Sequence, residues 1–191
     1  VRYGFIAWLA EAARLIKELD PNHLVSTGNE GLFGCEQDPD LLERVNAIAD
    51  IDYMTVHIWP YNWNWVRADA LAADLDSALV KTDDYIEKNL AVARRHALPM
   101  VVEEFGFPRD GFSDSREAST ACRDRYYAHM FAKVADRTLA GVNFWGWSGF
   151  AQPAHSQWER GDDYTGDPAQ EAQGLNGVYV TDSTIEIIKS F

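Results

Sequence analysis

Hydrophobic residues along this chain fall either at helix-like spacing or in short continuous runs. Apolar positions three or four residues apart predict helices, because they then share one face. Short apolar runs bounded by Gly, Pro, Asn or Asp predict strands. We expect helices over residues 3–19, 39–49, 71–97, 116–139 and 183–189. We expect strands over residues 23–27, 51–58, 101–107 and 141–147, and a long loop over residues 148–179.

The order of these elements predicts the fold class. Strands that alternate with helices form a parallel sheet with right-handed crossovers. Chemically active side chains stand at the end of each predicted strand, where (β/α)8 barrels place their sites. Four strands make half of such a barrel, and no strand precedes the first helix. We therefore expect residues 1–191 to be the second half of a single (β/α)8 TIM barrel, about strands 5 to 8, with the first half outside this sequence.

Two adjacent carboxylates end the third predicted strand. The apolar run before Glu103 and Glu104 is β-branched, which predicts a strand buried on both faces. Acidic residues at the end of such a strand are placed where parallel sheets bind ligands. Since successive side chains point to opposite faces, only one of the pair is expected to face a pocket. The other is expected to be a buried or hydrogen-bonded structural acid.

Composition narrows the function classes. The formal net charge of −13 argues against nucleic acid, which needs a basic surface, and against an anionic membrane. The two cysteines form neither a disulfide framework nor a metal-ligand spacing. The acidic residues of the 148–179 loop are more typical of a solvated surface than of a cation site, so we expect no metal and no cofactor. Seven Trp and eight Tyr are compatible with sugar stacking, although most aromatic residues serve the core.

Four motifs in order carry a resemblance to a known family. They are DPNHLV at 20–25, TVHIWP at 55–60, VEEFG at 102–106 and NFWGW at 143–147. In order and approximate spacing they resemble glycoside hydrolase family 5, and most of all its bacterial endo-β-1,4-mannanases. The tail from 161 to 176, with GDDY, GDP and QGLN, is similar to the same group. The resemblance covers nearly the whole chain and matches the second half of the family's barrel.

The resemblance implies roles for individual residues. The glutamate directly before the aromatic-Gly pair is the family's nucleophile, which corresponds to Glu104. The family's sixth-strand histidine corresponds to His57, and its eighth-strand tryptophan, the floor for the sugar at the cleavage point, to Trp145. Where the family often has a tyrosine bonded to the nucleophile, this chain has Trp59, which can donate a hydrogen bond but not accept one. Trp147, near the same strand end as Trp145, is a further expected substrate contact.

The Asn29-Glu30 pair looks like the family's general acid/base motif. However, it follows the DPNHLV turn, which places it on the fifth strand rather than the fourth. We expect Glu30 to line the cleft or to orient its neighbours, and the true acid/base to precede Val1. His57 taken alone could equally be a core histidine with satisfied hydrogen bonds.

The resemblance therefore implies a retaining endo-β-1,4-mannanase with Glu104 as nucleophile, acting on mannan, glucomannan or galactomannan. The alternatives are a β-1,4-glucanase of the same family and a catalytically inactive carbohydrate-binding fragment. The expected partners are the polysaccharide and the missing half of the barrel. The resemblance also implies a secreted or periplasmic protein.

Overall fold

The computed structural model describes residues 2–191. Its helices are α1 (Arg2–Leu19), α2 (Pro39–Asn46), α3 (Leu71–Arg95), the short 3-10 helix η1 (Asp110–Phe112), α4 (Ala121–Ala135) and α5 (Thr184–Lys189). Its strands are β1 (Met54–Ile58), β2 (Met100–Phe105), β3 (Gly141–Phe144), β4 (Trp147–Gly149) and β5 (Val178–Tyr179).

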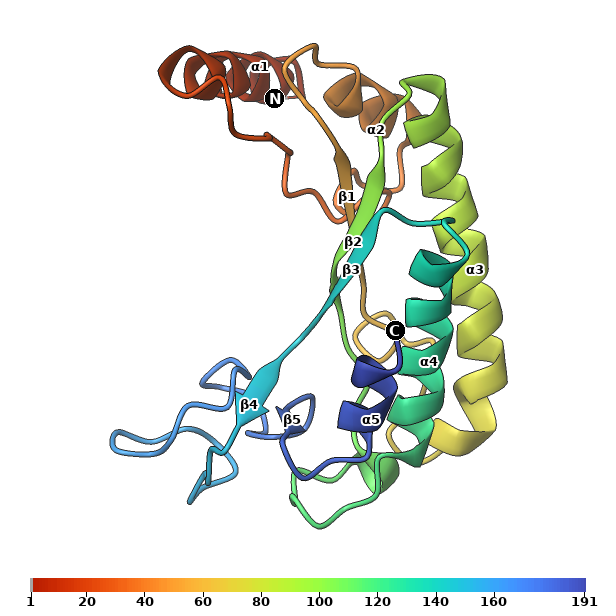
Figure 1. Ribbon diagram of the computed structural model, residues 1–191, viewed down its shortest axis with the longest axis vertical. Helices are drawn as coiled ribbons and strands as arrows, with labels where there is room; N and C mark the ends of the chain where they lie inside the picture. The colour runs from red at the N-terminus through yellow and green to blue at the C-terminus, as the bar shows by residue number, and fades with distance from the viewer. Residues whose placement is uncertain (1) are drawn as a thin grey trace.

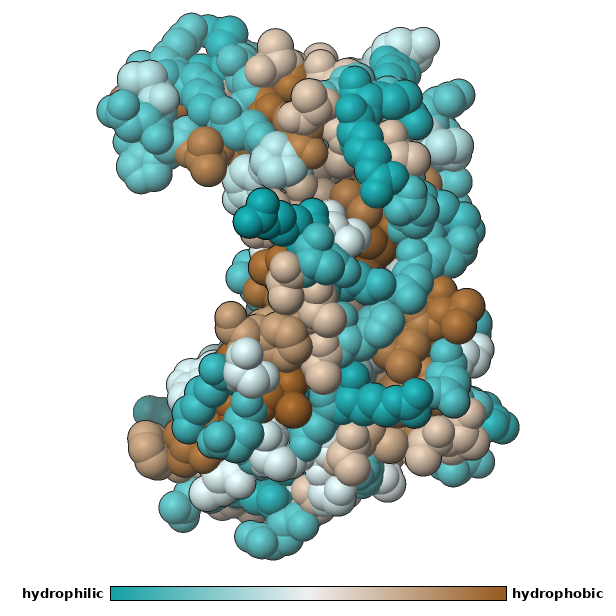
Figure 2. Space-filling model, turned by 45° about the vertical axis from the view of Figure 1, so that its right-hand side comes forward, coloured by the Kyte–Doolittle hydropathy of each residue, from teal (hydrophilic) through white to brown (hydrophobic). Residues whose placement is uncertain are grey.

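A parallel sheet in the order β1-β2-β3 forms the centre of the molecule. Helices α3 and α4 cover one side of this sheet, whereas α1 and α2 lie beyond one end of it and β4 and β5 beyond the other (Figure 1). The ribbon therefore curves like an arc around the side that the helices leave open. The space-filling view shows this side as a deep indentation (Figure 2). The arc is the arrangement expected for part of a barrel, with helices outside and strands inside.

The long helix α3 is held against the sheet by a regular apolar stripe. Its buried residues follow the spacing that puts them on one face, at positions 71, 75, 78, 82, 85, 86, 89, 90, 92 and 93. Tyr126, Tyr127 and Met130 of α4 are fully buried in the same core. From the sheet, Val56, Val102 and other strand residues meet these helices with no exposed surface. The core thus lies between the sheet and its outer helices.

The central strand differs from its prediction in one respect. Met100, Val102 and Phe105 of β2 are buried under the helices, but Val101 and the residues at 103 and 104 are only half-buried. The expectation of a strand buried on both faces is therefore wrong for this chain. The inner face of β2 belongs to the open side of the arc, which the described residues do not cover.

The first predicted strand, over residues 23–27, is also wrong, because these residues form no strand. This segment and the loop after it form isolated hydrogen bonds with residues in and just before β1 in place of a ladder. The Asp52 N–H donates to the Val25 carbonyl (2.8 Å), and the Thr55 hydroxyl donates to the Asn29 carbonyl (3.0 Å). Isolated bonds of this kind hold the 28–31 loop in place, but they are not the regular backbone pairing that defines a strand.

The fourth predicted strand, over residues 141–147, forms as β3 and ends at Phe144, and a separate strand, β4, begins at Trp147; the peptide bond between Trp145 and Gly146 is cis. The predicted helices all form; α1 starts one residue earlier than predicted, and the other four are shorter than predicted. The largest trimming is at α4, which starts at Ala121 rather than near residue 116. The Asp110 carboxylate explains this start, because it accepts the first free N–H groups of the helix, from Ala121 and Cys122 (both 3.0 Å).

Two buried arginines bind backbone carbonyls of the loop between β4 and β5 and hold it in place. Arg123 of α4 donates to the carbonyls of Phe107 (2.8 Å), Leu175 (2.6 Å) and Gly177 (2.8 Å). Arg109 forms a 2.6 Å ion pair with Asp182, and both side chains are almost fully buried. Burial lowers the pKa of the Arg123 guanidinium, so these carbonyls and the single carboxylate compensate a costly desolvation.

Replacing Asp182 with Ala should therefore destabilise the fold strongly. The change leaves two buried guanidinium groups without their carboxylate, a loss of about 3–5 kcal/mol in the free energy of unfolding. Chemical denaturation followed by far-ultraviolet circular dichroism measures it. The matched control is Glu186→Ala in the adjacent α5, whose pair with Lys189 is exposed and should contribute nothing measurable. Equal stability of the two variants would contradict the anchoring role.

Candidate functional site

Four side chains predicted from the sequence meet at the carboxyl ends of β1 and β2. The Nε2 atom of His57 lies 3.1 Å from Glu103 Oε2, and its Nδ1 atom lies 3.4 Å from Glu104 Oε2. The indole N–H of Trp59 donates to Glu104 Oε2 at 3.3 Å. The departure from tyrosine at position 59 therefore preserves a donor to the expected nucleophile.

A bulge in the β1–β2 pairing brings both carboxylates to one histidine. Val56 pairs with Val102, but the next residue of β1, His57, pairs with Glu104, so Glu103 is the extra residue. Such an insertion interrupts the strict alternation of side chains. Of the two carboxylates only Glu104 lines the cavity described below, while Glu103 contacts His57 Nε2, as expected for a hydrogen-bonded structural acid. Both carboxylates are about one-third exposed, at 34% and 32%, and both contact the same imidazole ring.

Glu30 completes the group from the loop that follows the first helix. Its Oε1 atom lies 4.0 Å from His57 Nδ1, and its side chain is 45% exposed. Its backbone is fixed, because the Tyr85 hydroxyl donates to its carbonyl at 2.5 Å and the His57 N–H does so at 3.3 Å. The structure thus places Glu30 beside His57, and its expected role in lining the cleft or orienting its neighbours stays a prediction.

A cavity of about 240 Å³ opens beside Glu104. It is lined by Trp59, Asn62, Glu104, Trp145, Pro168, Glu171 and Asn176. Trp145 is half-buried in this wall, where an indole can present its apolar face to a sugar ring. Trp147 is not part of the lining and is 56% exposed on β4. The structure therefore brings Trp145, but not Trp147, next to the carboxylates.

Glu171 is the main lining residue that the sequence did not reveal. Burial, together with repulsion from Asp167, raises the pKa of its carboxyl group. It lies in the long loop between β4 and β5, far from any strand end and outside the motifs. The only available signal was its place between two tail motifs, GDP and QGLN, that carry the resemblance.

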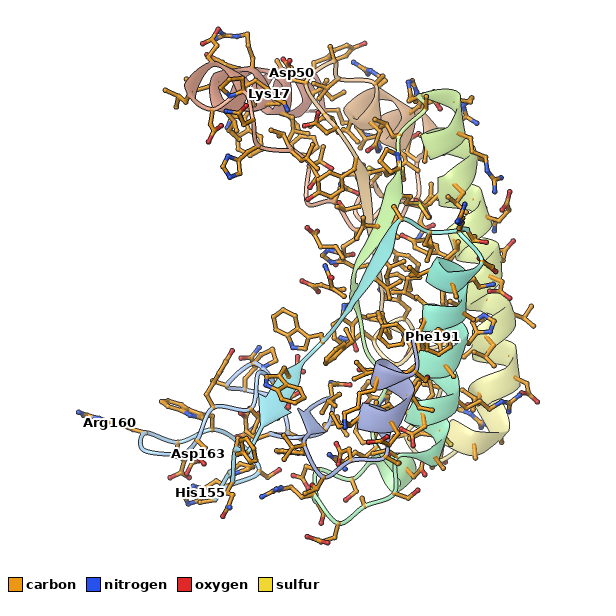
Figure 3. All side chains as sticks on the ribbon, viewed as in Figure 1. Lys17, Asp50, His155, Arg160, Asp163 and Phe191 are labelled. Atoms are coloured by element: carbon orange, nitrogen blue, oxygen red, sulfur yellow. The ribbon has the colours of Figure 1, made fainter. Side chains whose placement is uncertain are left out.

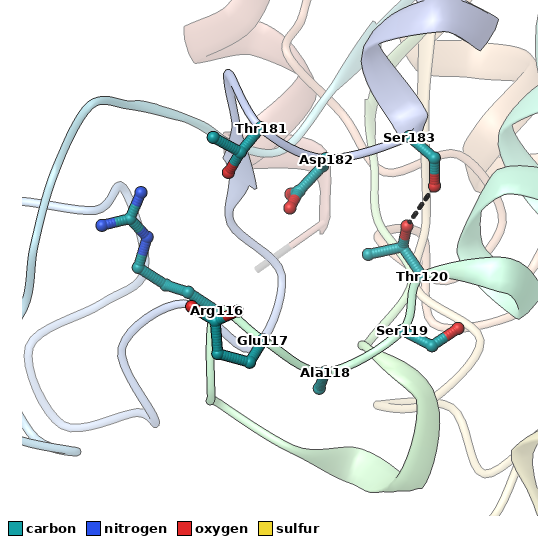
Figure 4. A pocket seen from close by; sticks show the side chains of 8 residues that line it. All are labelled: Arg116, Glu117, Ala118, Ser119, Thr120, Thr181, Asp182 and Ser183. Carbon is teal, nitrogen blue, oxygen red and sulfur yellow. Dashed lines mark hydrogen bonds between the residues drawn. The ribbon is translucent and has the colours of Figure 1, made fainter.

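Other surface features do not repeat this arrangement. A hollow of about 530 Å³ lies between the segments that precede α4 and α5 (Figure 4). It contains Arg116 and a 3.0 Å hydrogen bond between Thr120 and Ser183, but none of the predicted site residues. His155, Arg160 and Asp163 project from the β4–β5 loop, away from the sheet (Figure 3). Within residues 2–191, no group of three or more His, Cys, Asp or Glu is arranged to hold a metal ion. None of the helices described is both long and apolar enough to cross a membrane.

Gly106 leaves room for the indole of Trp59 next to the site. A substitution at Gly106 therefore tests this geometry directly. A Cβ atom at this position would lie 2.5 Å from the Trp59 ring and 3.0 Å from the Trp145 carbonyl oxygen. Gly106→Ala should therefore displace Trp59 and destabilise the fold by about 1–3 kcal/mol through overpacking. Thermal melting and tryptophan fluorescence measure the two effects. Gly4→Ala is the control, since nothing lies within 4 Å of a Cβ atom there. An unchanged melt and spectrum for Gly106→Ala would contradict this packing.

Comparison with known proteins gives the site its context. A rice protein named putative mannan endo-1,4-beta-mannosidase 9 is 29% identical over 155 residues, which cover 73% of this chain. The crystal structure of a family 5 mannosidase from Rhizomucor miehei matches 97% of the chain with a TM-score of 0.85 and 29% identity. An endo-β-1,4-mannanase from Thermotoga petrophila matches 99% of it with a TM-score of 0.60 and 22% identity, a likeness of fold.

The chain spans 35% of the length of the rice protein, 46% of the Rhizomucor mannosidase and 39% of the Thermotoga mannanase. This coverage confirms the predicted fold class, part of a (β/α)8 barrel. The family model described as "GH family 5 beta-mannosidase-like" matches residues 3–191. On that match, which leaves out only the first two residues, the chain belongs to glycoside hydrolase family 5.

Proposed function

We propose that this chain supplies the nucleophile-bearing part of a retaining endo-β-1,4-mannanase that hydrolyses mannan, glucomannan or galactomannan. The observation that carries the proposal is the position of Glu104. Its carboxylate lines the cavity together with Trp145, and Trp59 donates to one of its oxygens. A carboxylate that accepts a hydrogen bond beside an apolar sugar platform fits the role of a glycosidase nucleophile.

In the proposed reaction, a Glu104 oxygen forms a bond to the anomeric carbon while the glycosidic C–O bond breaks. The leaving oxygen takes a proton from a second carboxyl group, about 5–5.5 Å from the nucleophile in retaining enzymes. That group then removes a proton from water, which attacks the glycosyl ester and releases Glu104. We expect this acid/base to be the glutamate of the family's fourth-strand Asn-Glu pair, N-terminal to the residues described.

The remaining site residues bind and orient the sugar in this proposal. Trp145 forms the floor at the cleavage point and Trp59 lines the same cavity, while His57 contacts Glu104 and Glu30 faces His57. Trp147, exposed beyond the cavity, contacts a neighbouring sugar unit of the chain. Because a polysaccharide is too large to enter a cell, we expect the protein to act outside the cytoplasm.

A second candidate is a β-mannosidase that removes single sugars from chain ends. The curated relatives from rice and Arabidopsis are named as mannan endo-1,4-beta-mannosidases, with 26–29% identity. The structure with a TM-score of 0.85 is instead described as a mannosidase, and its mutant was crystallised with mannosyl-fructose. The β4–β5 loop favours this second candidate, since its residues Pro168, Glu171 and Asn176 border the small cavity at Glu104.

The products of a defined oligosaccharide separate the two candidates. A complete barrel that contains this chain should cut mannohexaose internally and release a mixture of shorter oligosaccharides from the first minutes. Chromatography of early time points measures this. Release of mannose alone, with oligosaccharides that shorten by one sugar at a time, would contradict the endo-acting proposal and support the exo-acting candidate.

The role of Glu104 is tested by removing its carboxylate. In the same complete barrel, Glu104→Ala should lower kcat by about 10³-fold or more, because no glycosyl-enzyme ester can form. Added azide should restore part of the turnover by attacking from the vacated face, which gives a product of inverted anomeric configuration. Nuclear magnetic resonance of the product identifies that configuration.

Glu159→Ala is the control for this experiment, since its carboxylate is 66% exposed in the β4–β5 loop. It should keep full activity. Near-normal turnover by Glu104→Ala, or azide rescue without inversion, would show that Glu104 is not the nucleophile.

A further inference from the structure

Three carboxylates surround the single imidazole ring of His57. Glu103 contacts its Nε2 atom at 3.1 Å, while Glu104 and Glu30 face its Nδ1 atom at 3.4 and 4.0 Å. The histidine side chain is only 12% exposed, so water has little access to either nitrogen. Within residues 2–191, these three carboxylates form no ion pair with any lysine or arginine.

The two ring nitrogens cannot both be satisfied in a neutral imidazole. That form has one N–H donor and one acceptor nitrogen, whereas an ionised carboxylate can only accept. A proton on Nε2 satisfies Glu103 but turns the lone pair of Nδ1 toward Glu104. The opposite tautomer leaves the lone pair of Nε2 facing Glu103 at hydrogen-bond distance. Protons on both nitrogens make every one of these contacts attractive.

The bulge in β2 creates this situation. In a regular strand the side chain at 103 would point away from the one at 104. Here Glu103 is the inserted residue, and its carboxylate reaches the same ring from the other nitrogen. A Cβ atom placed on Gly28 would lie 3.9 Å from Glu103 Oε2, so the 28–31 loop borders this carboxylate as well.

We propose that Glu103 holds His57 as a doubly protonated imidazolium cation, and that it is thereby a positioning residue for Glu104. The consequence of this inference for catalysis rests on the proposed function. The cation and the Trp59 N–H both face Oε2 of Glu104, at 3.4 and 3.3 Å. Among the described residues no hydrogen bond reaches Oε1 of Glu104, so Oε1 is the oxygen left to attack the sugar.

The protonation state can be read directly from the chain at neutral pH without substrate. Nitrogen-15 spectra of histidine-labelled protein distinguish ring nitrogens that carry a proton from those that do not. Wild-type His57, assigned by the loss of its signals in His57→Gln, should show two proton-bearing nitrogens. In Glu103→Gln one of them should shift toward the signal of a nitrogen without a proton.

The matched control is Glu43→Gln, which removes the carboxylate of α2 that faces Nε2 of His96 at the end of α3. It should leave the His57 signals unchanged. A wild-type His57 with one unprotonated nitrogen would overturn the proposal, and this result does not depend on any variant folding. An unchanged His57 spectrum in a folded Glu103→Gln would equally overturn the role of Glu103.

Kinetics of the complete barrel then separate positioning from general stability. Glu103→Gln should lower kcat by about tenfold or more with KM within about twofold, because binding contacts to the sugar remain. Glu103→Asp, which keeps the charge, should recover part of kcat. A rise in KM alone, or a loss that tracks the melting temperature, would contradict positioning. The spectra test His57 separately, so an inactive barrel with a doubly protonated His57 would count against the proposed function only.

Discussion

The parallel pairing of β1 with β2 is the constraint on which the site depends. These strands end side by side, and one inserted residue at Glu103 changes which side chains face His57. Two carboxylates from consecutive positions then share one ring on the open side of the arc. Helices α3 and α4 pack against the opposite face of the sheet and fix the positions of both strands. The core therefore sets the geometry of the site.

The second requirement is a wall for the cavity, and it comes from a loop with very little regular structure. Buried Arg109 and Arg123 bind the carbonyls of residues 174, 175 and 177, and Asp182 compensates their charge. Asp167 adds to this by accepting the Gly174 N–H at 2.7 Å. The segment that bears Glu171 and Asn176 is thereby held beside Glu104. The loop is irregular in backbone but fixed by buried ionic and polar contacts.

Much of this arrangement is encoded in local patterns that can be recognised in the sequence. Helical spacing of apolar residues predicts α1, α3 and α4 to within a few residues at most ends, because burial of one face decides their formation. The VEEFG and TVHIWP motifs place Glu104, His57 and Trp59 at strand ends, and parallel strands then bring them together.

The features that sequence patterns miss depend on contacts between distant segments. Nothing in the local sequence at 102–105 distinguishes a bulge from a regular strand, since the bulge exists only relative to β1. The 23–27 segment has strand-like residues but forms isolated hydrogen bonds with its neighbour. Glu171 reaches the cavity because its loop is held by Arg109 and Arg123, which lie 65 and 52 residues before the carbonyls that they bind. Roles for Glu103 and Glu171 therefore require the three-dimensional structure.

The most direct test of the central claim is to trap the covalent intermediate. A 2-deoxy-2-fluoro mannoside with a good leaving group should inactivate the complete barrel by forming a stable ester with the nucleophile. Mass spectrometry of the digested protein then locates the label. We predict that it is found on Glu104. Label on Glu103, or on a residue outside β2, would contradict the assignment.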